Sequence, residues 1–305
     1  MTGAGPSADV LRVLGSFVEP PEARHFALAE ALRLPAPDSL NEWRVLHTRA
    51  FIDQCHPYAS VYAGPEGAIG GEAMARIGDF QRTIGAQPCP EPDHLTVLMG
   101  CYARLCEIAG EDTRARHPRR VMLWEHLLSW LPPYLLGVCR SAPEPYAQWG
   151  RLMLEVFQAE AQASGEPESL PLHLSAAPPF EDEAGFMSRD AFLAALLTPV
   201  RSGLVITQHD LSLAAQLLNV SPGFGGRRFL LQTLIGQKTG PALRWLACEA
   251  RRQADAYAHE MATPLGDVAG FWRRRALATA DALNSMESTV GGLTAAHMPK
   301  RQIAG

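Results

Sequence analysis

The residues with the clearest chemical potential are a carboxylate and an imidazole in the sequence Glu91-Pro92-Asp93-His94. Proline suits the first position of a helix, where its missing N–H costs nothing, so the pattern predicts a helix start with Asp93 in the first turn. The helix dipole favours an anion at that position. The functional interpretation is a carboxylate that grips a basic peptide, next to an imidazole that can change charge near neutral pH. The structural alternative is that Asp93 only stabilises the helix start and His94 only packs nearby.

A second group lies on the predicted helix that contains Glu125, His126, Leu127 and Trp130. His126 and Trp130 are four residues apart, so they lie one above the other on one helix face. Apolar residues with charged residues at their edge are typical of a groove that binds an amphipathic segment. The same pattern also fits a core helix whose histidine is satisfied by a backbone carbonyl.

Two tyrosines, Tyr58 and Tyr62, flank the short run Ala59-Ser60-Val61. Aromatic rings at these positions could stack against an incoming peptide, or they could plug the end of a helical bundle. The sequence alone leaves both interpretations open.

Metal and nucleotide sites have little support from spacing. Two E-x-x-H strings occur, Glu22–His25 and Glu91–His94, whereas a di-metal helical bundle needs two such strings in mid-helix and two further inward glutamates. Pro92 places the second string at a helix start. The pair His209-Asp210 resembles a metal phosphohydrolase dyad but is isolated, and Asp210 is the acid of a predicted helix cap. The sequence has no C-x-x-C pair and no phosphate-binding P-loop, so we predict no metal, no cofactor and no catalytic residue.

The composition is that of an ordinary globular protein with a mildly acidic charge. The 305 residues include 27 Lys and Arg against 32 Asp and Glu, which gives a net charge of −5. A nucleic-acid partner would require a basic stripe, so this class is not expected. Residues 1–18 lack the basic start and apolar run of a secretory signal, and no stretch is apolar enough to span a membrane. We therefore expect a cytoplasmic protein.

Apolar residues recur mostly at spacings of three and four, the period of amphipathic helices, and strand-like alternation is scarce. Capping boxes beginning at Ser39 and Thr207 predict two helix starts. The pair Pro132-Pro133 must bend or end its helix, because proline lacks a backbone donor. Helices are expected over residues 39–53, 71–84, 93–109, 119–140, 146–163, 189–197, 208–218, 226–237, 241–261 and 266–284.

The prolines between residues 164 and 186 divide this series into two helical blocks. We predict a first domain over residues 1–163, a proline-rich linker or strap over 164–186, a C-terminal helical domain over 187–287 and a disordered tail over 288–305. Exchange of a domain across the strap would produce a homodimer.

Taken together and in this order, the strings resemble the TorD family of chaperones, also called the TorD/DmsD/NarJ type. The run from His126 to Pro132 matches the family pattern H-L-x-x-W-hydrophobic-P in full. The pair Asp93-His94 corresponds to the acid–histidine hallmark of the group, and the run Tyr58–Tyr62 is similar to its aromatic–serine–aromatic loop. The similarity covers residues from about 10 to 160. The second block looks like the extension found in longer members.

The resemblance implies an all-α protein, with a TorD-like helical bundle followed by a second C-terminal helical block. Family members bind the twin-arginine signal peptide, and sometimes the body, of a molybdenum-cofactor oxidoreductase, and hold the apoenzyme until its cofactor is loaded. The implied partner is therefore an apo-molybdoenzyme catalytic subunit and its signal peptide. The predicted peptide-binding residues are Asp93, His94, Glu125, His126, Trp130, Leu127, Tyr58, Tyr62 and Glu91.

We place Asp93 and Glu125 on an acidic rim, His94 and His126 on its floor, and Trp130 with Leu127 in an apolar groove. Two alternatives remain at this point. One is a helical enzyme with a di-metal site in the bundle. The other is an assembly factor that grips a mature domain without reading the signal peptide.

Overall fold

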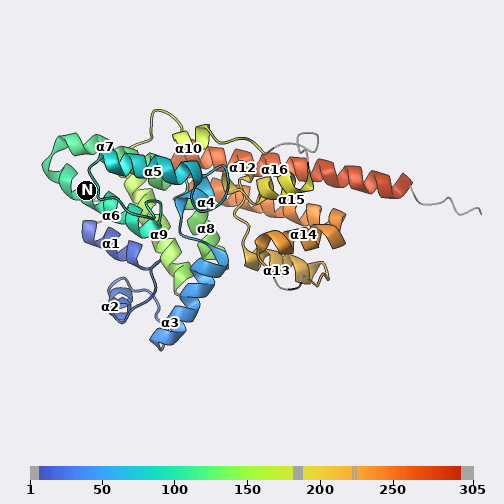
Figure 1. The fold of residues 1–305 in the computed structure, drawn as a ribbon, viewed down its shortest axis with the longest axis horizontal. Helices are drawn as coiled ribbons and strands as arrows, with labels where there is room; N and C mark the ends of the chain where they lie inside the picture. Colours follow the sequence, from blue (N-terminus) through green and yellow to red (C-terminus); the bar gives the residue numbers. More distant parts are fainter. Residues whose placement is uncertain (1–6, 181–187, 222, 224, 297–305) are drawn as a thin grey trace, which may run out of the picture.

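A computed structural model describes residues 7–180, 188–221, 223 and 225–296, and the helices follow one another along the whole described chain (Figure 1). Its first half contains α1 (Ala8–Ser16), α2 (Arg24–Ala31), α3 (Leu40–His47), η1 (Thr48–Gln54), α4 (Ala59–Ala63), α5 (Gly71–Thr83), α6 (Leu95–Glu111), η2 (Thr113–Ala115), α7 (Arg116–Val121), η3 (Met122–Leu128), α8 (Leu131–Ser141) and α9 (Tyr146–Ser164). Within the described ranges no strand occurs, and the only β-type pairing is an isolated bridge between Tyr58 and His94.

The second half contains α10 (Leu172–Ser175), α11 (Arg189–Leu196), α12 (Pro199–Ser202), α13 (Gln208–Leu217), α14 (Arg227–Gln237), α15 (Thr239–Ala256), η5 (Tyr257–Met261) and α16 (Ala262–Ala296). The all-α prediction is confirmed. Helix α16 is interrupted near its start by non-helical backbone at Thr263, Pro264 and Gly266. From there it runs beside α15 along the long axis of the molecule (Figure 1).

Local chemistry explains several helix ends. The hydroxyl of Ser39 accepts from the backbone N–H of Glu42, as the first capping box predicts. Thr207 and Asp210 form the complete reciprocal box at the start of α13. The helix through Trp130 breaks just before the proline pair, and Pro132 with Pro133 then occupies the first turn of α8, where missing donors cost nothing.

The predicted start of the third helix is wrong. Helix α6 begins at Leu95, two residues later than expected, so Asp93 is not in its first turn. The chain before it is extended and pairs with a second segment. The N–H of Ala59 donates to Asp93 O at 3.0 Å, and the N–H of Leu95 donates to Pro57 O at 2.9 Å. Pairing with the distant segment around Tyr58 therefore keeps Asp93 and His94 out of the helix in which the local sequence would place them.

The first block packs around α8, where every residue from Leu131 to Val138 is buried. Helices α1 and α6 pack together, as do α8 and α9. Trp149 of α9 is fully buried, and its indole N–H donates to Leu14 O at 3.0 Å, which fixes α1 onto the bundle. A helix that is hydrophobic on all sides belongs at the centre of a bundle.

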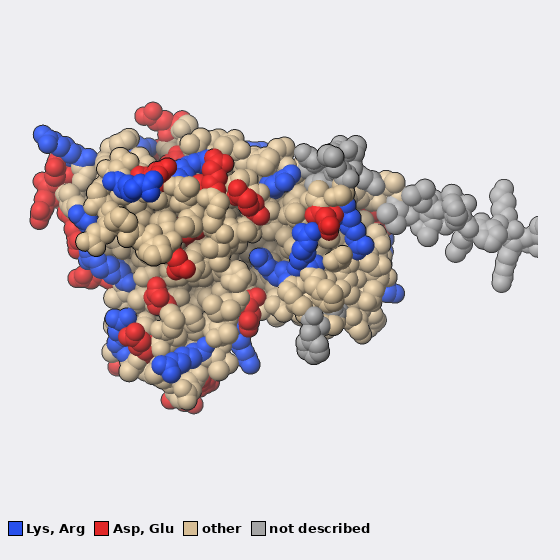
Figure 2. Space-filling model, in the orientation of Figure 1, with Lys and Arg blue, Asp and Glu red and all other residues tan. Residues whose placement is uncertain are grey.

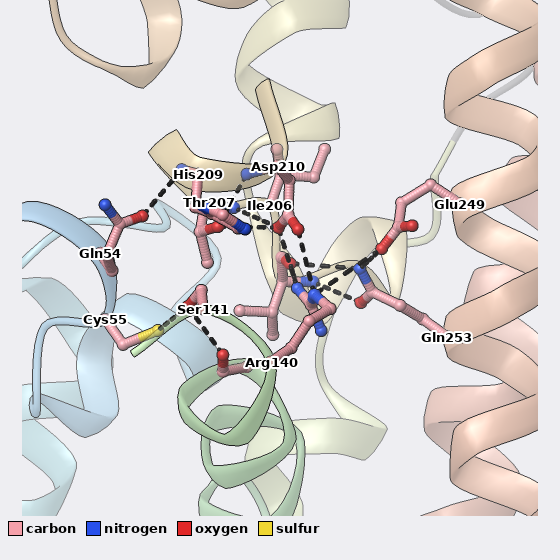
Figure 3. Close-up of polar contacts among 12 residues, drawn as sticks. Gln54, Cys55, Arg140, Ser141, Ile206, Thr207, His209, Asp210, Glu249 and Gln253 are labelled. Carbon is pink, nitrogen blue, oxygen red and sulfur yellow. Dashed lines mark hydrogen bonds and ion pairs between the residues drawn. The ribbon is translucent and has the colours of Figure 1, made fainter. Parts of the chain in front are cut away.

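The two blocks share a buried polar junction. Arg140 points from α8 toward the start of α13 and toward α15 (Figure 3). Its guanidinium donates to Asp210 at 2.9 and 3.1 Å and to Val205 O at 2.7 Å. The side chain of Gln253 in α15 bonds to the same residue, because its amide oxygen accepts from the N–H of Val205 at 3.0 Å. Arg140 thereby ties the first block to helices of the second.

The proline-rich segment is packed against the first block over its described part. Helix α10 lies within it, and His173, Leu174, Ala177 and Phe180 are buried. Residues 181–187 of the predicted linker lie outside the described residues. The predicted disordered tail also needs correction, because α16 continues to Ala296; residues 297–305 lie outside the described part.

Candidate functional site

Asp93 fastens α4 to the segment that precedes α6. Its carboxylate oxygen Oδ2 accepts from the N–H of Ser60 at 3.1 Å and from the Ser60 hydroxyl at 2.5 Å. The N–H of Gly70 in turn donates to the Ser60 hydroxyl at 3.1 Å. Asp93 is fully buried, and its second oxygen, Oδ1, has no hydrogen-bond partner among the described residues. Asp93 is therefore beneath the surface and not on an open rim as predicted.

An acidic corner surrounds His94, which is N-cap of α6. Its ring packs edge-on against Tyr58 at 4.8 Å between centroids, and Nδ1 lies 3.6 Å from a carboxylate oxygen of Glu19. Burial lowers the pKa of His94, while Glu19, Glu91 and Asp93 act to raise it. The pKa of Tyr58 is raised to about 12, first by burial and then by Glu91. Glu91 is exposed and the side chain of Glu19 is 42% exposed, so this corner presents carboxylates to solvent.

Helix α5 lies between this corner and His126. Gln81 donates its side-chain N–H to Pro92 O at 2.7 Å on one side. Its neighbour Phe80 lies on the other side, with its ring 4.5 Å from that of His126. A cavity of about 410 Å³ lies on the Pro92 side and is lined by residues that include Met74, Gly78, Arg82, Pro88, Cys89 and Pro92. The predicted site residues thus fall on both flanks of one helix.

The π-helical segment η3 presents Glu125 and His126 toward α10. Glu125 is partly buried and accepts from the backbone N–H of Leu172 at 2.7 Å. Burial raises the pKa of Glu125, and the bond from Leu172 counters this. Burial and, to a smaller extent, nearby Arg76 lower the pKa of His126 to about 4. The Nδ1 atom of His126 has no hydrogen-bond partner among the described residues.

The surface charge around these features is mixed. Acidic and basic side chains intermingle on the face shown in Figure 2, and the whole chain carries a net charge of −5. No broad single-sign field on this face would steer a ligand over long range. Recognition must then depend on local groups such as the carboxylates beside His94.

Comparison with protein families identifies the first block. Residues 17–135 match the family described as the nitrate reductase delta subunit. The domain formed by these residues belongs to this family of NarJ/TorD-type chaperones. No curated protein matches the chain. Every predicted site residue, from Tyr58 to Trp130, lies within the matched range.

Family membership implies a chaperone for molybdoenzyme maturation that binds the catalytic subunit of its client. Chaperones of the nitrate reductase delta subunit family are not catalysts. Across the described residues, no three His, Cys, Asp or Glu side chains come together as a metal site. None of the described helices combines the length and apolar character needed to cross a membrane.

Three predicted peptide contacts are core residues of the delta-subunit domain. Leu127 and Trp130 have no exposed surface, and Tyr62 is 2% exposed. The Trp130 ring stacks on Tyr62 at 5.6 Å and packs against Tyr134 at 5.4 Å. The groove predicted on Trp130 and Leu127 is filled by the protein's own side chains. In this conformation Tyr62, Leu127 and Trp130 are part of the core beneath the surface. Their direct contact with a peptide stays a prediction.

Sequence reasoning missed three residues that contact the predicted site residues or their neighbours, namely Ser60, Arg76 and His173. Ser60 lies between Tyr58 and Tyr62 in sequence. Its hydroxyl, which can donate a hydrogen bond to a carboxylate such as Asp93, was the signal that could have identified it. Arg76 of α5 faces His173 of α10, with Nη1 3.3 Å from the histidine Nδ1. His173 is 97 residues from Arg76 in sequence, and a proline-rich setting gives no sign that it is buried.

Proposed function

We propose that the chain is a system-specific chaperone that binds the twin-arginine signal peptide, the apo form, or both, of a molybdenum-cofactor oxidoreductase. It holds this client for cofactor insertion before export or assembly. The single observation that carries the proposal is the match of residues 17–135 to the nitrate reductase delta subunit family. The cytoplasm, where chaperones of this family act, is the expected location.

The acidic corner supplies a place for the basic end of a signal peptide. Glu91 is exposed and Glu19 is half-exposed next to His94, and Tyr58 adds an aromatic ring. Carboxylates make short, charge-assisted hydrogen bonds to guanidinium groups, about twice as strong as neutral ones. Glu19 lies beside His94, and Glu91 interacts with Tyr58. Among the described residues neither carboxylate forms an ion pair with an arginine or lysine, so an arginine pair placed here would meet two acceptors that no guanidinium occupies.

The cavity beside α5 supplies apolar surface for the hydrophobic part of the peptide. Met74, Gly78, Pro88 and Pro92 contribute to its walls, and a Cβ added at Gly78 would be in ordinary contact with Pro92. Each square ångström of apolar surface removed from water stabilises the complex by roughly 25 cal/mol. The corner and the cavity adjoin at Pro92, which lies between Glu91 and Asp93, so one extended peptide can reach both.

Titration calorimetry tests this proposal with a synthetic peptide that carries two adjacent arginines followed by an apolar run. Glu91→Gln should weaken binding about tenfold, as expected for loss of one charge-assisted bond. The matched control is Asp255→Asn on α15, which removes the same charge from an exposed position outside the site. A peptide in which both arginines are replaced by glutamine should bind equally weakly to the parent chain and to Glu91→Gln.

Binding of the apo catalytic subunit without its signal, together with no binding of the peptide, would instead indicate an assembly factor that does not read the signal. A homodimer stays a prediction, and light scattering of the purified chain tests it.

A further inference from the structure

The chain covers part of its own chaperone domain with residues 171–177 of the proline-rich segment. From here on, the word strap refers to these seven residues alone. Beneath it lies the docking face, defined as Ala73, Arg76, Phe80, Glu125 and His126. In Figure 1 the segment that follows α9 carries α10, which lies beside α5. The neighbourhood of Ala73, Arg76, His173 and Ala177 encloses only about 30 Å³ of free space, so strap and face are closely packed.

The strap engages the docking face as a bound peptide would. Its backbone supplies a donor, because the N–H of Leu172 bonds to the Glu125 carboxylate at 2.7 Å. It also supplies apolar anchors, since Leu174 is fully buried and Ala177 is 9% exposed. Backbone bonds combined with side chains in pockets are the way in which proteins commonly bind extended and short helical peptides.

The strap leaves some buried polar atoms at the docking face without hydrogen-bond partners among the described residues. His126 Nδ1 and His173 Nε2 are both buried without a hydrogen-bond partner among the described residues, and the two rings lie 5.6 Å apart. Each unsatisfied buried polar atom costs about 1–3 kcal/mol. The Leu172 side chain is 54% exposed and contributes little packing. A competing segment that bonds to His126 Nδ1, and thereby releases His173 of the strap to water, has free energy to gain by replacing the strap.

We propose that the strap is an internal occupant of a second client-binding surface, and that an arginine-bearing apolar segment of the client displaces it. This inference rests on the proposed chaperone function and adds a site and a means of regulation to it. The docking face is closed in the free chaperone and opens when a client segment takes the place of residues 171–177. A free chaperone then hides apolar surface that would otherwise be exposed.

The chemistry of the face selects the occupant. Glu125 is a partly buried carboxylate whose bond from the strap comes from a neutral N–H. A guanidinium from a client would replace this with a charge-assisted bond, which is the stronger kind. Phe80 and Ala73 offer apolar contacts beside it. Arg76 of the same face also acts on Glu125, so repulsion between the two guanidinium groups offsets part of this gain. The apolar contacts and the unsatisfied Nδ1 of His126 add to the preference for an arginine-bearing apolar segment over the strap.

The variant Leu172→Pro provides a sharp test. Proline removes only the N–H that bonds to Glu125, because Leu172 is the first residue of α10 and proline is tolerated there. The preceding residue, Pro171, already has the extended backbone that proline requires before it. The matched control is Leu172→Ala, which shortens the same exposed side chain and keeps the N–H. Circular dichroism melts check that both variants are folded.

We expect Leu172→Pro to bind the synthetic twin-arginine peptide about tenfold more tightly than Leu172→Ala, because the lost bond holds the strap closed. We also expect the peptide to accelerate hydrogen exchange at the amides of residues 172–177 of the unaltered chain, while the amides of η3 stay protected. Peptide binding to Leu172→Pro with no detectable binding to the parent chain would also support the strap as the competitor.

Equal affinities for the two variants, with unchanged exchange over residues 172–177, would overturn the inference and leave the proposed function standing on its acidic corner. Absence of binding to every variant would overturn both, since no client segment would then be available to displace the strap. The two failures are therefore distinguishable in one set of titrations.

Discussion

Asp93 and Ser60, 33 residues apart in sequence, are joined by two hydrogen bonds to a single carboxylate oxygen, at 2.5 and 3.1 Å. This junction holds α4 against the extended segment before α6, and with it the Tyr58–His94 bridge. The acid of the family's acid–histidine pair thus shapes the acidic corner from beneath, while His94, Glu91 and Tyr58 form its surface.

Removal of the Asp93 carboxylate should destabilise the protein strongly. Asp93→Ala leaves the buried N–H and hydroxyl of Ser60 without their acceptor, at a cost of about 1–3 kcal/mol for each group. We expect a loss of about 2–4 kcal/mol of unfolding free energy in urea denaturation. The control Asp79→Ala removes a carboxylate from an exposed ion pair with Arg82 and should cost under about 1 kcal/mol. An equal effect of the two substitutions would contradict the structural role of Asp93.

The second prediction concerns Asp210, which binds Arg140 at the junction between the two blocks. Asp210 is 6% exposed at its side chain, and the bonds from Arg140 hold its pKa below the usual range although burial acts to raise it. Asp210→Ala removes the nearest carboxylate from the buried guanidinium and leaves it only Glu249 at 4.0 Å and the Val205 carbonyl. It also removes the acid of the α13 capping box, and the two losses together should cost about 3–5 kcal/mol of unfolding free energy. Asp190→Ala breaks an exposed pair with Arg228 and should cost under about 1 kcal/mol. A small loss for Asp210→Ala would mean that the junction does not hold the blocks together.

Acid should weaken the protein through the histidines beneath the strap. Burial lowers the pKa of His126 to about 4 and of His173 to about 3. Both values lie below the unfolded value, so the unfolded chain binds more protons and stability is lost as the pH falls below about 6.5. At pH 5 the expected loss is about 2 kcal/mol for each histidine.

Chemical denaturation at pH 7 and pH 5 measures this loss directly. His126→Gln should reduce the difference between the two pH values by about 2 kcal/mol relative to the parent chain. His117→Gln, at an exposed position, is the control and should leave the difference unchanged. An identical pH difference in all three proteins would show that His126 is not held neutral by burial.

Gly203 should tolerate no side chain. Its φ is +73°, a left-handed conformation that glycine adopts most readily, and a Cβ there would collide with the backbone of Arg275 and Ala276 in α16. Gly203→Ala should cost at least about 3 kcal/mol, because rigid backbone and not a flexible side chain blocks the space. Gly100→Ala meets nothing within 4 Å and should leave the melting temperature close to that of the parent chain.

Features that depend on neighbouring residues were predictable from the sequence. Ser39 and Thr207 marked two helix starts because a hydroxyl and an acid three residues on are a local signal. The proline pair after Trp130 marked the break before α8 for the same reason. The all-α class followed from apolar spacing summed over many helices.

Features that depend on distant residues were not predictable. The extended backbone at His94 results from pairing with residues near Tyr58, and this pairing leaves no trace in the local pattern. An apolar face on the helix of Trp130 fits a groove and a core equally well, and only the packing of Tyr62 and Tyr134 against it shows the core. His173 lies among prolines that favoured a solvated linker, yet it is buried through contacts with α5 and η3.

Photo-cross-linking tests the central claim most directly, namely that a client peptide binds along the flanks of α5. The twin-arginine probe peptide would carry a benzophenone side chain in its apolar run, and mass spectrometry would locate the attachment sites. We predict adducts within residues 71–92 and 122–130, together with loss of those adducts when unlabelled peptide is added in excess. Adducts confined to α13 and α14, or adducts that excess unlabelled peptide does not reduce, would contradict the claim.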